Sequence, residues 1–182
     1  MALGMHEVTG GAKAAAPVVA GALARQPRTI CGDFHMRIAR DGSWHHEGSP
    51  IGRAPLVRLF STILRRERDG GFVLVTPVEK LEIDVEDAPF VAVEVKSEGE
   101  GRHRSLAFRT NVGDLVLAGP DRPLRAETCE GEPRLYVEVR PGLDALVARP
   151  VYYELAELGI GEGGDPIGLW SGGAFFPLEP GP

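Results

Sequence analysis

The apolar positions of this chain alternate, or recur at helical spacing, in separate segments that predict its elements. Residues 31–47 predict a β-hairpin whose three-residue loop, 40–42, ends on Gly42 in the left-handed conformation. This register pairs Ile38 with Trp44 and places the apolar side chains of the hairpin on one face. A two-residue turn would scatter them over both faces, so we predict the three-residue loop.

An amphipathic helix is predicted after the hairpin. Pro55 suits its first turn, where a missing N–H costs no hydrogen bond, and apolar residues recur at helical spacing as far as Leu64. We expect the helix to continue until Gly70 and Gly71 end it. Arginines on its polar side are expected to face solvent, with a phosphate or partner surface as the alternative. They are Arg58, Arg65, Arg66 and Arg68.

Three strand-like segments, 72–76, 78–86 and 90–96, complete the first half of the chain. Their alternating apolar residues predict an antiparallel meander beside the hairpin and the helix. The polar, glycine-rich stretch 97–104 is typical of a loop and is the predicted boundary between the halves.

Short strands separated by glycine and proline dominate the second half and predict a strongly curved sheet. We expect a helix after Leu143, whereas 151–158 suits a strand at its start and a helix at its end. A closing hairpin is predicted to pair Leu169 with Phe175 and to repeat the arrangement of the first hairpin. The predicted strands are 105–109, 114–118, 124–127 and 134–140.

These elements predict an α+β fold of two similar halves, each an antiparallel sheet with a helix. The predicted organisation has a flexible tail at 1–30 and a first half at 31–97 made of hairpin, helix and meander. A β-rich second half at 98–182 carries the second helix and the closing hairpin.

Composition narrows the class of protein. The chain has 182 residues and a net charge of -6, which argues against general nucleic-acid binding. No apolar run reaches the roughly 20 residues of a membrane helix. Cys31 and Cys129 are too far apart for a metal-binding motif and are expected to be free thiols in a reducing cytoplasm. We therefore predict a cytoplasmic protein without membrane contact, and we predict no oligomeric state.

Histidine and carboxylate side chains near the first hairpin raise the question of a metal. In the predicted register His35, His45 and Glu47 share one face, and these are good ligands for zinc or iron. No distant histidine completes the set, because only His6 and His103 remain and they lie in the tail and the polar loop. A polar hairpin face is the preferred interpretation, and neither a metal nor a cofactor is predicted.

The loop 48–53 leads into the predicted helix and is a candidate anion site. Free N–H groups at a helix start favour an anion, Arg53 would add a bidentate donor, and Gly52 would let a ligand approach the backbone. A tight capping loop is the competing interpretation, since no P-loop or dinucleotide fingerprint is present. In the second polar cluster, 76–80, Glu79 and Lys80 could serve as acid and base or lie on a strand surface.

Eight segments spread over the chain, taken together, resemble one bacterial family. They are 31–32 (CG), 37–44 (RIARDGSW), 48–53 (GSPIGR), 56–60 (LVRLF), 74–80 (LVTPVEK), 85–90 (VEDAPF), 149–155 (RPVYYEL) and 170–173 (WSGG). The chain is similar there to the family called domain of unknown function 1285, which is mainly proteobacterial and has no established activity. It departs from the family before Cys31, where 26–30 reads QPRTI instead of a proline-rich stretch with a tryptophan.

The resemblance implies two related α+β halves, the second superficially like a pleckstrin-homology fold. It also implies a site between the halves for a nucleotide-like ligand with a role in signalling. Together with Gly52, the matching positions give a set of candidate ligand-binding residues: Trp44, Glu47, Gly52, Arg53, Thr76, Glu79 and Lys80.

Three functions remain open at this point. The preferred one is a non-catalytic ligand-binding or regulatory module that takes an anionic, nucleotide-like small molecule between its halves. The first alternative is a hydrolase-type enzyme using Glu47, Glu79 and His45, with or without a metal. The second alternative is a protein-interaction module that uses exposed strand edges and the arginine-rich side of the helix.

Overall fold

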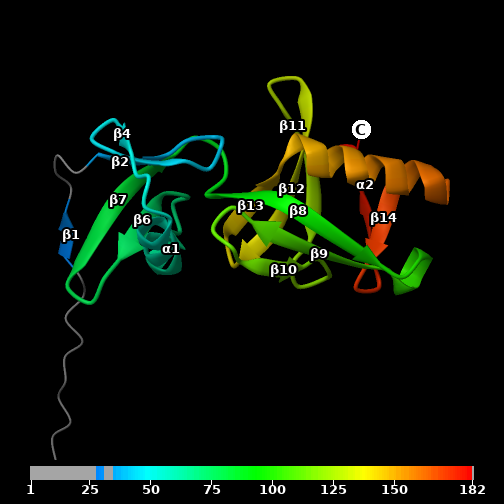
Figure 1. Ribbon diagram of the computed structural model, residues 1–182, viewed down its shortest axis with the longest axis horizontal. Helices are drawn as coiled ribbons and strands as arrows, with labels where there is room; N and C mark the ends of the chain where they lie inside the picture. Colours follow the sequence, from blue (N-terminus) through cyan, green and yellow to red (C-terminus); the bar gives the residue numbers. More distant parts are fainter. Residues whose placement is uncertain (1–27, 31–34, 182) are drawn as a thin grey trace, which may run out of the picture.

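Two β-sheets lie side by side in the computed structural model, which describes residues 28–30 and 35–181 (Figure 1). The first sheet has the strand order β4-β3-β2-β7-β6-β5, and β1 pairs with β7 in parallel. Its elements are β1 (Arg28–Ile30), β2 (Met36–Ile38), β3 (Trp44–His46), β4 (Ser49–Pro50), α1 (Ala54–Ile63), β5 (Leu64–Arg66), β6 (Phe72–Val75) and β7 (Glu79–Val85).

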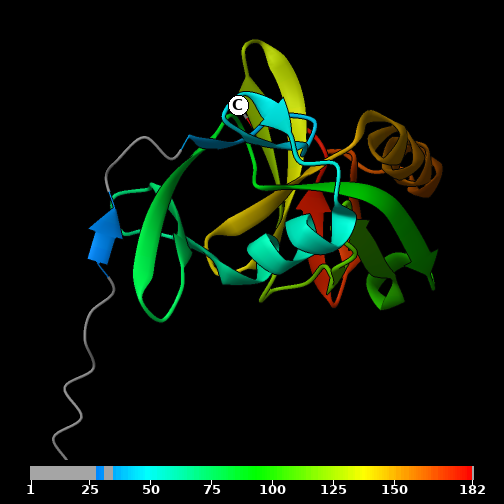
Figure 2. The ribbon, with the colours of Figure 1, turned by 60° about the vertical axis from the view of Figure 1, so that its left-hand side comes forward.

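The second sheet has the order β10-β9-β8-β13-β12-β11, and a separate two-stranded sheet closes the chain. Helix α2 packs against β14 and against β8 of this second sheet, as Figure 1 and the turned view of Figure 2 show. The elements are β8 (Phe90–Glu98), a 3-10 helix (Gly101–His103), β9 (Ser105–Thr110), β10 (Leu115–Leu117), β11 (Leu124–Cys129), β12 (Glu132–Arg140), β13 (Leu143–Val147), α2 (Arg149–Glu162), β14 (Gly168–Ser171) and β15 (Ala174–Pro177).

The α+β fold with two similar halves is confirmed, and so is the register of the first hairpin. Ile38 pairs with Trp44, and both side chains are buried, at 0% and 1% exposure. The Trp44 ring stacks on Phe60 of α1 with 6.1 Å between ring centroids. Buried apolar residues of both sheets form one continuous cluster, so the halves share a core.

Helix α1 ends at Ile63, and the prediction that it continues to Gly70 is wrong. Leu64 has extended backbone, with ψ at 136°, and pairs with Leu74 across the β5–β6 hairpin. The Leu64 side chain is completely buried. Burial and strand pairing there outweigh the helical propensity of the following arginines, and Gly70, at φ 95°, lies in the hairpin turn.

The strand at 90–98 belongs to the second sheet, so the predicted three-strand meander in the first half is wrong. β8 runs parallel to β13 and antiparallel to β9. Its first three residues are buried. The chain therefore crosses between the sheets at residues 86–89, before β8, and the loop 97–104 lies within the second half.

Residues 143–147 form strand β13, whereas a helix was predicted after Leu143. β13 lies in the sheet between β12 and β8, and this double pairing decides its conformation. The helix starts only at Arg149, with Pro150 in its first turn, and it includes the segment 151–158 that the sequence left open.

The closing hairpin pairs Leu169 with Phe176, and the predicted partner Phe175 instead faces Trp170. Gly172 and Gly173 both have positive φ, at 57° and 81°, which is the requirement of a two-residue turn. The turn shifts the register by one residue from the prediction.

Strand β1 covers residues 28–30, which the sequence assigned to the tail. Its residues pair in parallel with the start of β7. The remaining tail residues, 1–27, and Cys31 lie outside the described residues. Cys129, which is described, is a free thiol as predicted.

Candidate functional site

The joint between the halves is held by Asn111, in the turn between β9 and β10. Its Nδ2 donates a hydrogen bond to the Gly42 carbonyl at 3.1 Å, and its Oδ1 accepts one from the Val91 N–H at 3.1 Å. Gly42 has a φ of 80°, and a Cβ on it would lie 2.4 Å from Asn111 Nδ2. The left-handed turn of the first hairpin therefore brings its backbone into direct contact with the second half.

Two arginines attach α1 to the second half. Arg58 on α1 donates from Nε to the Val112 carbonyl at 3.0 Å. Arg140 on β12 donates from Nη2 to the carbonyl of Ser61 at 2.9 Å, and its guanidinium lies over the Phe90 ring at 5.2 Å. These contacts fix the helix against the second sheet.

A cavity of about 240 Å³ lies between these anchors. Its walls come from the first hairpin, the loop before α1, the start of α1 and the β9–β10 turn, so both halves contribute. The lining residues are Gly42, Ser43, Trp44, Pro50, Ile51, Gly52, Ala54, Val57, Arg58, Asn111 and Val112. We call this cavity the joint pocket.

The charged side chain that lines the joint pocket is Arg58. No carboxylate lines it, and among the described residues no acidic side chain forms an ion pair with Arg58. Trp44 is 1% exposed, and its buried Nε1–H has no acceptor within the described part of the chain. A buried donor without a partner costs about 1–3 kcal/mol, so an acceptor from a ligand would be stabilising here.

The loop at the start of α1 contributes less than the sequence predicted. Pro55 has no N–H, and the N–H groups of Leu56 and Val57 both bond to the Arg53 carbonyl, at 2.9 and 3.1 Å. Few backbone donors therefore remain at this helix start. Gly52 lines the joint pocket, whereas Arg53 is exposed and does not line it.

The remaining candidates lie elsewhere on the first half. Glu47 is exposed, with φ at 48°. Thr76 closes the β6–β7 turn, where its Oγ1 accepts a hydrogen bond from the Glu79 N–H at 2.9 Å. Lys80 forms an ion pair with Glu67 at 2.7 Å and lines a different cavity. The structure thus brings only Trp44 and Gly52 of the candidate set together at the joint pocket.

The structure does not assemble the metal or hydrolase arrangements. Within the described residues no cluster of three histidine, cysteine or carboxylate side chains could hold a metal. His45 Nε2 lies 2.9 Å from Ser43 Oγ, and that hydroxyl donates to Asp41. Strand β2 lies between His45 on β3 and Asp84 on β7. Glu79 is five residues from Asp84 on β7, which places it about 16 Å from Asp84 along the strand and still farther from His45.

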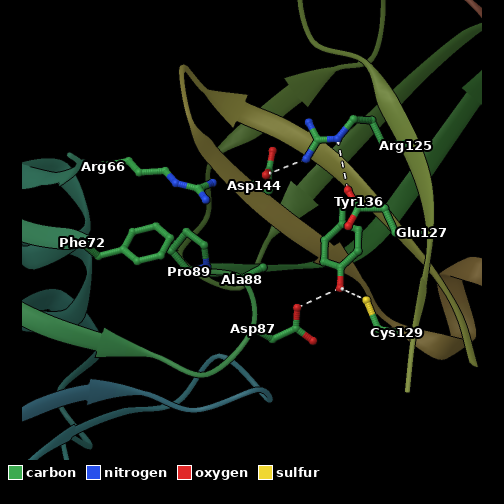
Figure 3. A pocket seen from close by; sticks show the side chains of 10 residues that line it. All are labelled: Arg66, Phe72, Asp87, Ala88, Pro89, Arg125, Glu127, Cys129, Tyr136 and Asp144. Atoms are coloured by element: carbon green, nitrogen blue, oxygen red, sulfur yellow. Dashed lines mark hydrogen bonds and ion pairs between the residues drawn. The ribbon is translucent and has the colours of Figure 1, made fainter. Parts of the chain in front are cut away.

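A second cavity between the halves, of about 380 Å³, has mixed charge (Figure 3). Arg66 and Phe72 line it from the first half, and Asp87 lines it from the segment 86–89 that crosses between the sheets. Tyr136 donates to Asp87 Oδ1 at 2.8 Å and lies 3.5 Å from Cys129 Sγ. Burial, and then these two neighbours, raise the pKa of the Tyr136 hydroxyl above its ordinary value.

This second cavity suits an anion poorly. Three carboxylates line it, and one of its two arginines is occupied by two of them. Arg125 donates to Asp144 Oδ2 at 2.8 Å and lies 3.5 Å from Glu127. The hydrogen bond to Asp144 raises the pKa of the Arg125 guanidinium. The other arginine of this cavity, Arg66, lies over the Phe72 ring at 5.3 Å and forms no ion pair within the described residues.

Fold and pockets define a two-sheet α+β protein with ligand-sized cavities at its joint. Family profiles match both halves: the "Domain of unknown function (DUF1285), N-terminal domain" over residues 25–88 and the "Protein of unknown function (DUF1285), C-terminal domain" over residues 89–178. The chain therefore belongs to the DUF1285 family, as the resemblance predicted.

Two solved structures of that family are similar to this chain. The DUF1285 family protein from Silicibacter pomeroyi DSS-3 is 52% identical, with a TM-score of 0.78, over 85% of this chain and 84% of the other. The one from Shewanella baltica OS155 is 26% identical, with a TM-score of 0.55, over 72% and 94%. The comparison with curated proteins gives no match. No helix in the described ranges is long and apolar enough to cross a membrane.

Sequence reasoning missed Arg58 and Asn111 as site residues. Arg58 was placed among the polar arginines of the helix, with a phosphate surface only as an alternative. Nothing in its local pattern separates it from Arg65, because its distinguishing contact is with Val112, which is far away in the sequence. Asn111 likewise reveals its role only through Gly42.

Proposed function

We propose that this protein is a non-catalytic, cytoplasmic binding module in signalling that takes the anionic group of a nucleotide-like small molecule in the joint pocket. The observation that carries the proposal is the pairing of an uncompensated cation with an unused donor. Arg58 and Trp44 line one cavity that has no carboxylate among its described lining residues, and the buried Trp44 Nε1–H has no acceptor in the described part of the chain. A phosphate or carboxylate group would accept hydrogen bonds from both.

The position of the pocket supports a regulatory role. Its walls are the same segments that hold the halves together, since Asn111 and Arg58 both line it and both bridge the joint. A ligand bound there contacts both halves and favours the arrangement in which they are closed on each other. At about 240 Å³ the pocket accommodates an anionic head group rather than a complete nucleotide.

The test is ligand-dependent thermal stability of the full chain with inorganic phosphate and adenosine monophosphate as probes. Ligand at a hundred times its dissociation constant stabilises the folded state by about 2.7 kcal/mol. For a chain of this length that corresponds to a rise of about 5–10 °C in Tm. Isothermal titration calorimetry then gives the dissociation constant for each variant.

Matched variants locate the site. Arg58→Gln removes the cation and is expected to weaken binding at least tenfold, and Trp44→Phe removes the indole N–H while retaining a stacked ring. Arg68→Gln, an exposed arginine in the β5–β6 turn, is the control and should bind as the unaltered chain does. Equal binding by Arg58→Gln and the control would refute the proposal. If instead Arg53→Ala alone abolished binding, the site would be the loop before α1.

A further inference from the structure

Strand β10 forms an open edge of the second sheet. Among the described strands only β9 hydrogen-bonds to it. The Thr110 N–H donates to the Asp114 carbonyl and the Ala118 N–H to the Leu106 carbonyl, both at 2.9 Å, at the two ends of the pairing. Hydrogen-bonded pairs alternate along an antiparallel ladder, so the backbone N–H and C=O groups of residues 115 and 117 point away from β9.

The side chains on this edge are apolar and exposed. Leu115 is 75% exposed and Leu117 is 54% exposed, which is unusual for two leucines on one short strand. They border a groove of about 480 Å³ on the sheet face. Two rows of paired residues cross the groove: Leu117 with Ala107 and Lys96, and Leu115 with Arg109 and Glu94.

The rim of the groove is positive, although the chain carries a net charge of -6. Lys96, Arg109 and Arg122 line it, against a single carboxylate, Glu94. Arg109 Nε donates to Glu94 at 2.7 Å, so that acid is already neutralised. Lys96 and Arg122 form no ion pair within residues 35–181, and they leave two positive charges beside the apolar edge.

We propose that β10 is a docking edge for an extended acidic segment of a partner protein, which adds to the second sheet as a further strand. The outward N–H and C=O groups of Leu115 and Leu117 pair with its backbone. Side chains alternate between the two faces of an added strand. Its acidic side chains lie on the groove face, where their methylene groups cover Leu115 and Leu117 and their carboxylates are attracted by Lys96 and Arg122. Its apolar side chains lie on the opposite face, beside Val116, which is 1% exposed. A second copy of this chain is the poorer occupant, because self-pairing would bring the same cations together.

The probe for this edge is a fluorescent nine-residue peptide of alternating glutamate and valine, with a lysine–valine peptide as its charge control. Fluorescence anisotropy with the full chain should show binding of the acidic peptide, at least tenfold weaker binding of the basic one, and weakening with added salt. No binding of the acidic peptide, or equal binding of the two peptides, overturns the proposal.

Methylating backbone nitrogens of the peptide tests whether it binds by adding a strand to the sheet. Only alternate residues of an added strand direct their N–H groups toward β10. Methylating the backbone nitrogens of the valines in one peptide and of the glutamates in another should therefore abolish binding of one and preserve binding of the other. Equal behaviour of the two methylated peptides contradicts pairing with a strand edge.

Variants of the protein test whether the peptide binds at β10. Changing Leu115 and Leu117 together to serine removes apolar surface without adding charge, and it should weaken peptide binding at least tenfold. Val78→Ser is the matched control, because Val78 is 71% exposed on the other half. Unchanged affinity in the double variant overturns the proposal. A dimer in analytical ultracentrifugation that the double variant dissociates would also overturn it, in favour of a second copy.

Discussion

Gly42 offers a direct test of how the two halves are joined. It has a φ of 80°, and a Cβ built on it lies 2.4 Å from Asn111 Nδ2 and 2.9 Å from Val91 Cγ2. Gly48 has almost the same φ, 79°, with nothing within 4 Å of its Cβ position. An alanine at either position would have the same backbone strain from its positive φ. The two positions differ in the atoms that the new methyl group would contact.

We expect Gly48→Ala to cost about 1 kcal/mol of unfolding free energy, which is the strain of a left-handed alanine. Gly42→Ala adds displacement of Asn111 and with it the loss of a joint hydrogen bond worth about 1 kcal/mol, for a total near 2–3 kcal/mol. Urea unfolding followed by circular dichroism measures both values.

A double-mutant cycle identifies the origin of the difference. In an Asn111→Ala background the contact with Asn111 is removed and the contact with Val91 remains, so Gly42→Ala should cost less than in the unaltered chain and still more than Gly48→Ala. Equal costs for the two glycine variants in the unaltered chain would refute the reasoning. So would an undiminished cost of Gly42→Ala without the Asn111 side chain.

Two further stability predictions follow from the second half. Hydrogen bonding from buried Arg104 lowers the pKa of Glu162, so this contribution is present above the ordinary carboxyl pKa and is lost as pH falls through the folded-state value. Glu162→Gln should therefore cost about 1 kcal/mol in urea unfolding at pH 7, because solvent screens this partly exposed ion pair, and the cost should shrink as the pH is lowered; a cost that does not fall with pH would contradict it. Leu155 on α2 is 0% exposed and Ile160 is 64% exposed, so Leu155→Ala should cost about 2–5 kcal/mol and Ile160→Ala under 0.5 kcal/mol in the same assay. Similar costs for the two variants would show that α2 does not pack as described.

Local patterns predicted the elements whose conformation is decided by their nearest neighbours. The Ile38–Trp44 register followed from the need to bury one face of a short hairpin, and the structure confirms it. The closing hairpin failed the same reasoning by one residue, because two consecutive glycines at 172 and 173 allow a tighter turn than the first hairpin has.

Distant partners decided the elements that local patterns misassigned. Leu64 begins a strand because β6 is available to pair with it, although the arginines after it favour a helix. Leu143 begins a strand because β13 lies between β8 and β12. In each case pairing and burial in the assembled sheet outweigh a propensity difference of less than about 1 kcal/mol per residue.

The candidate site divides in the same way. The sequence by itself determined the α+β class, the two-half organisation and the family, and its candidate set included Trp44 and Gly52, which line the joint pocket. Only the tertiary structure selected Arg58 over Arg53 as the cation of that cavity, since the β9–β10 turn that completes it comes from the other half. A pocket between two halves is formed by residues that no local pattern relates, so its chemistry appears only when the halves have packed together.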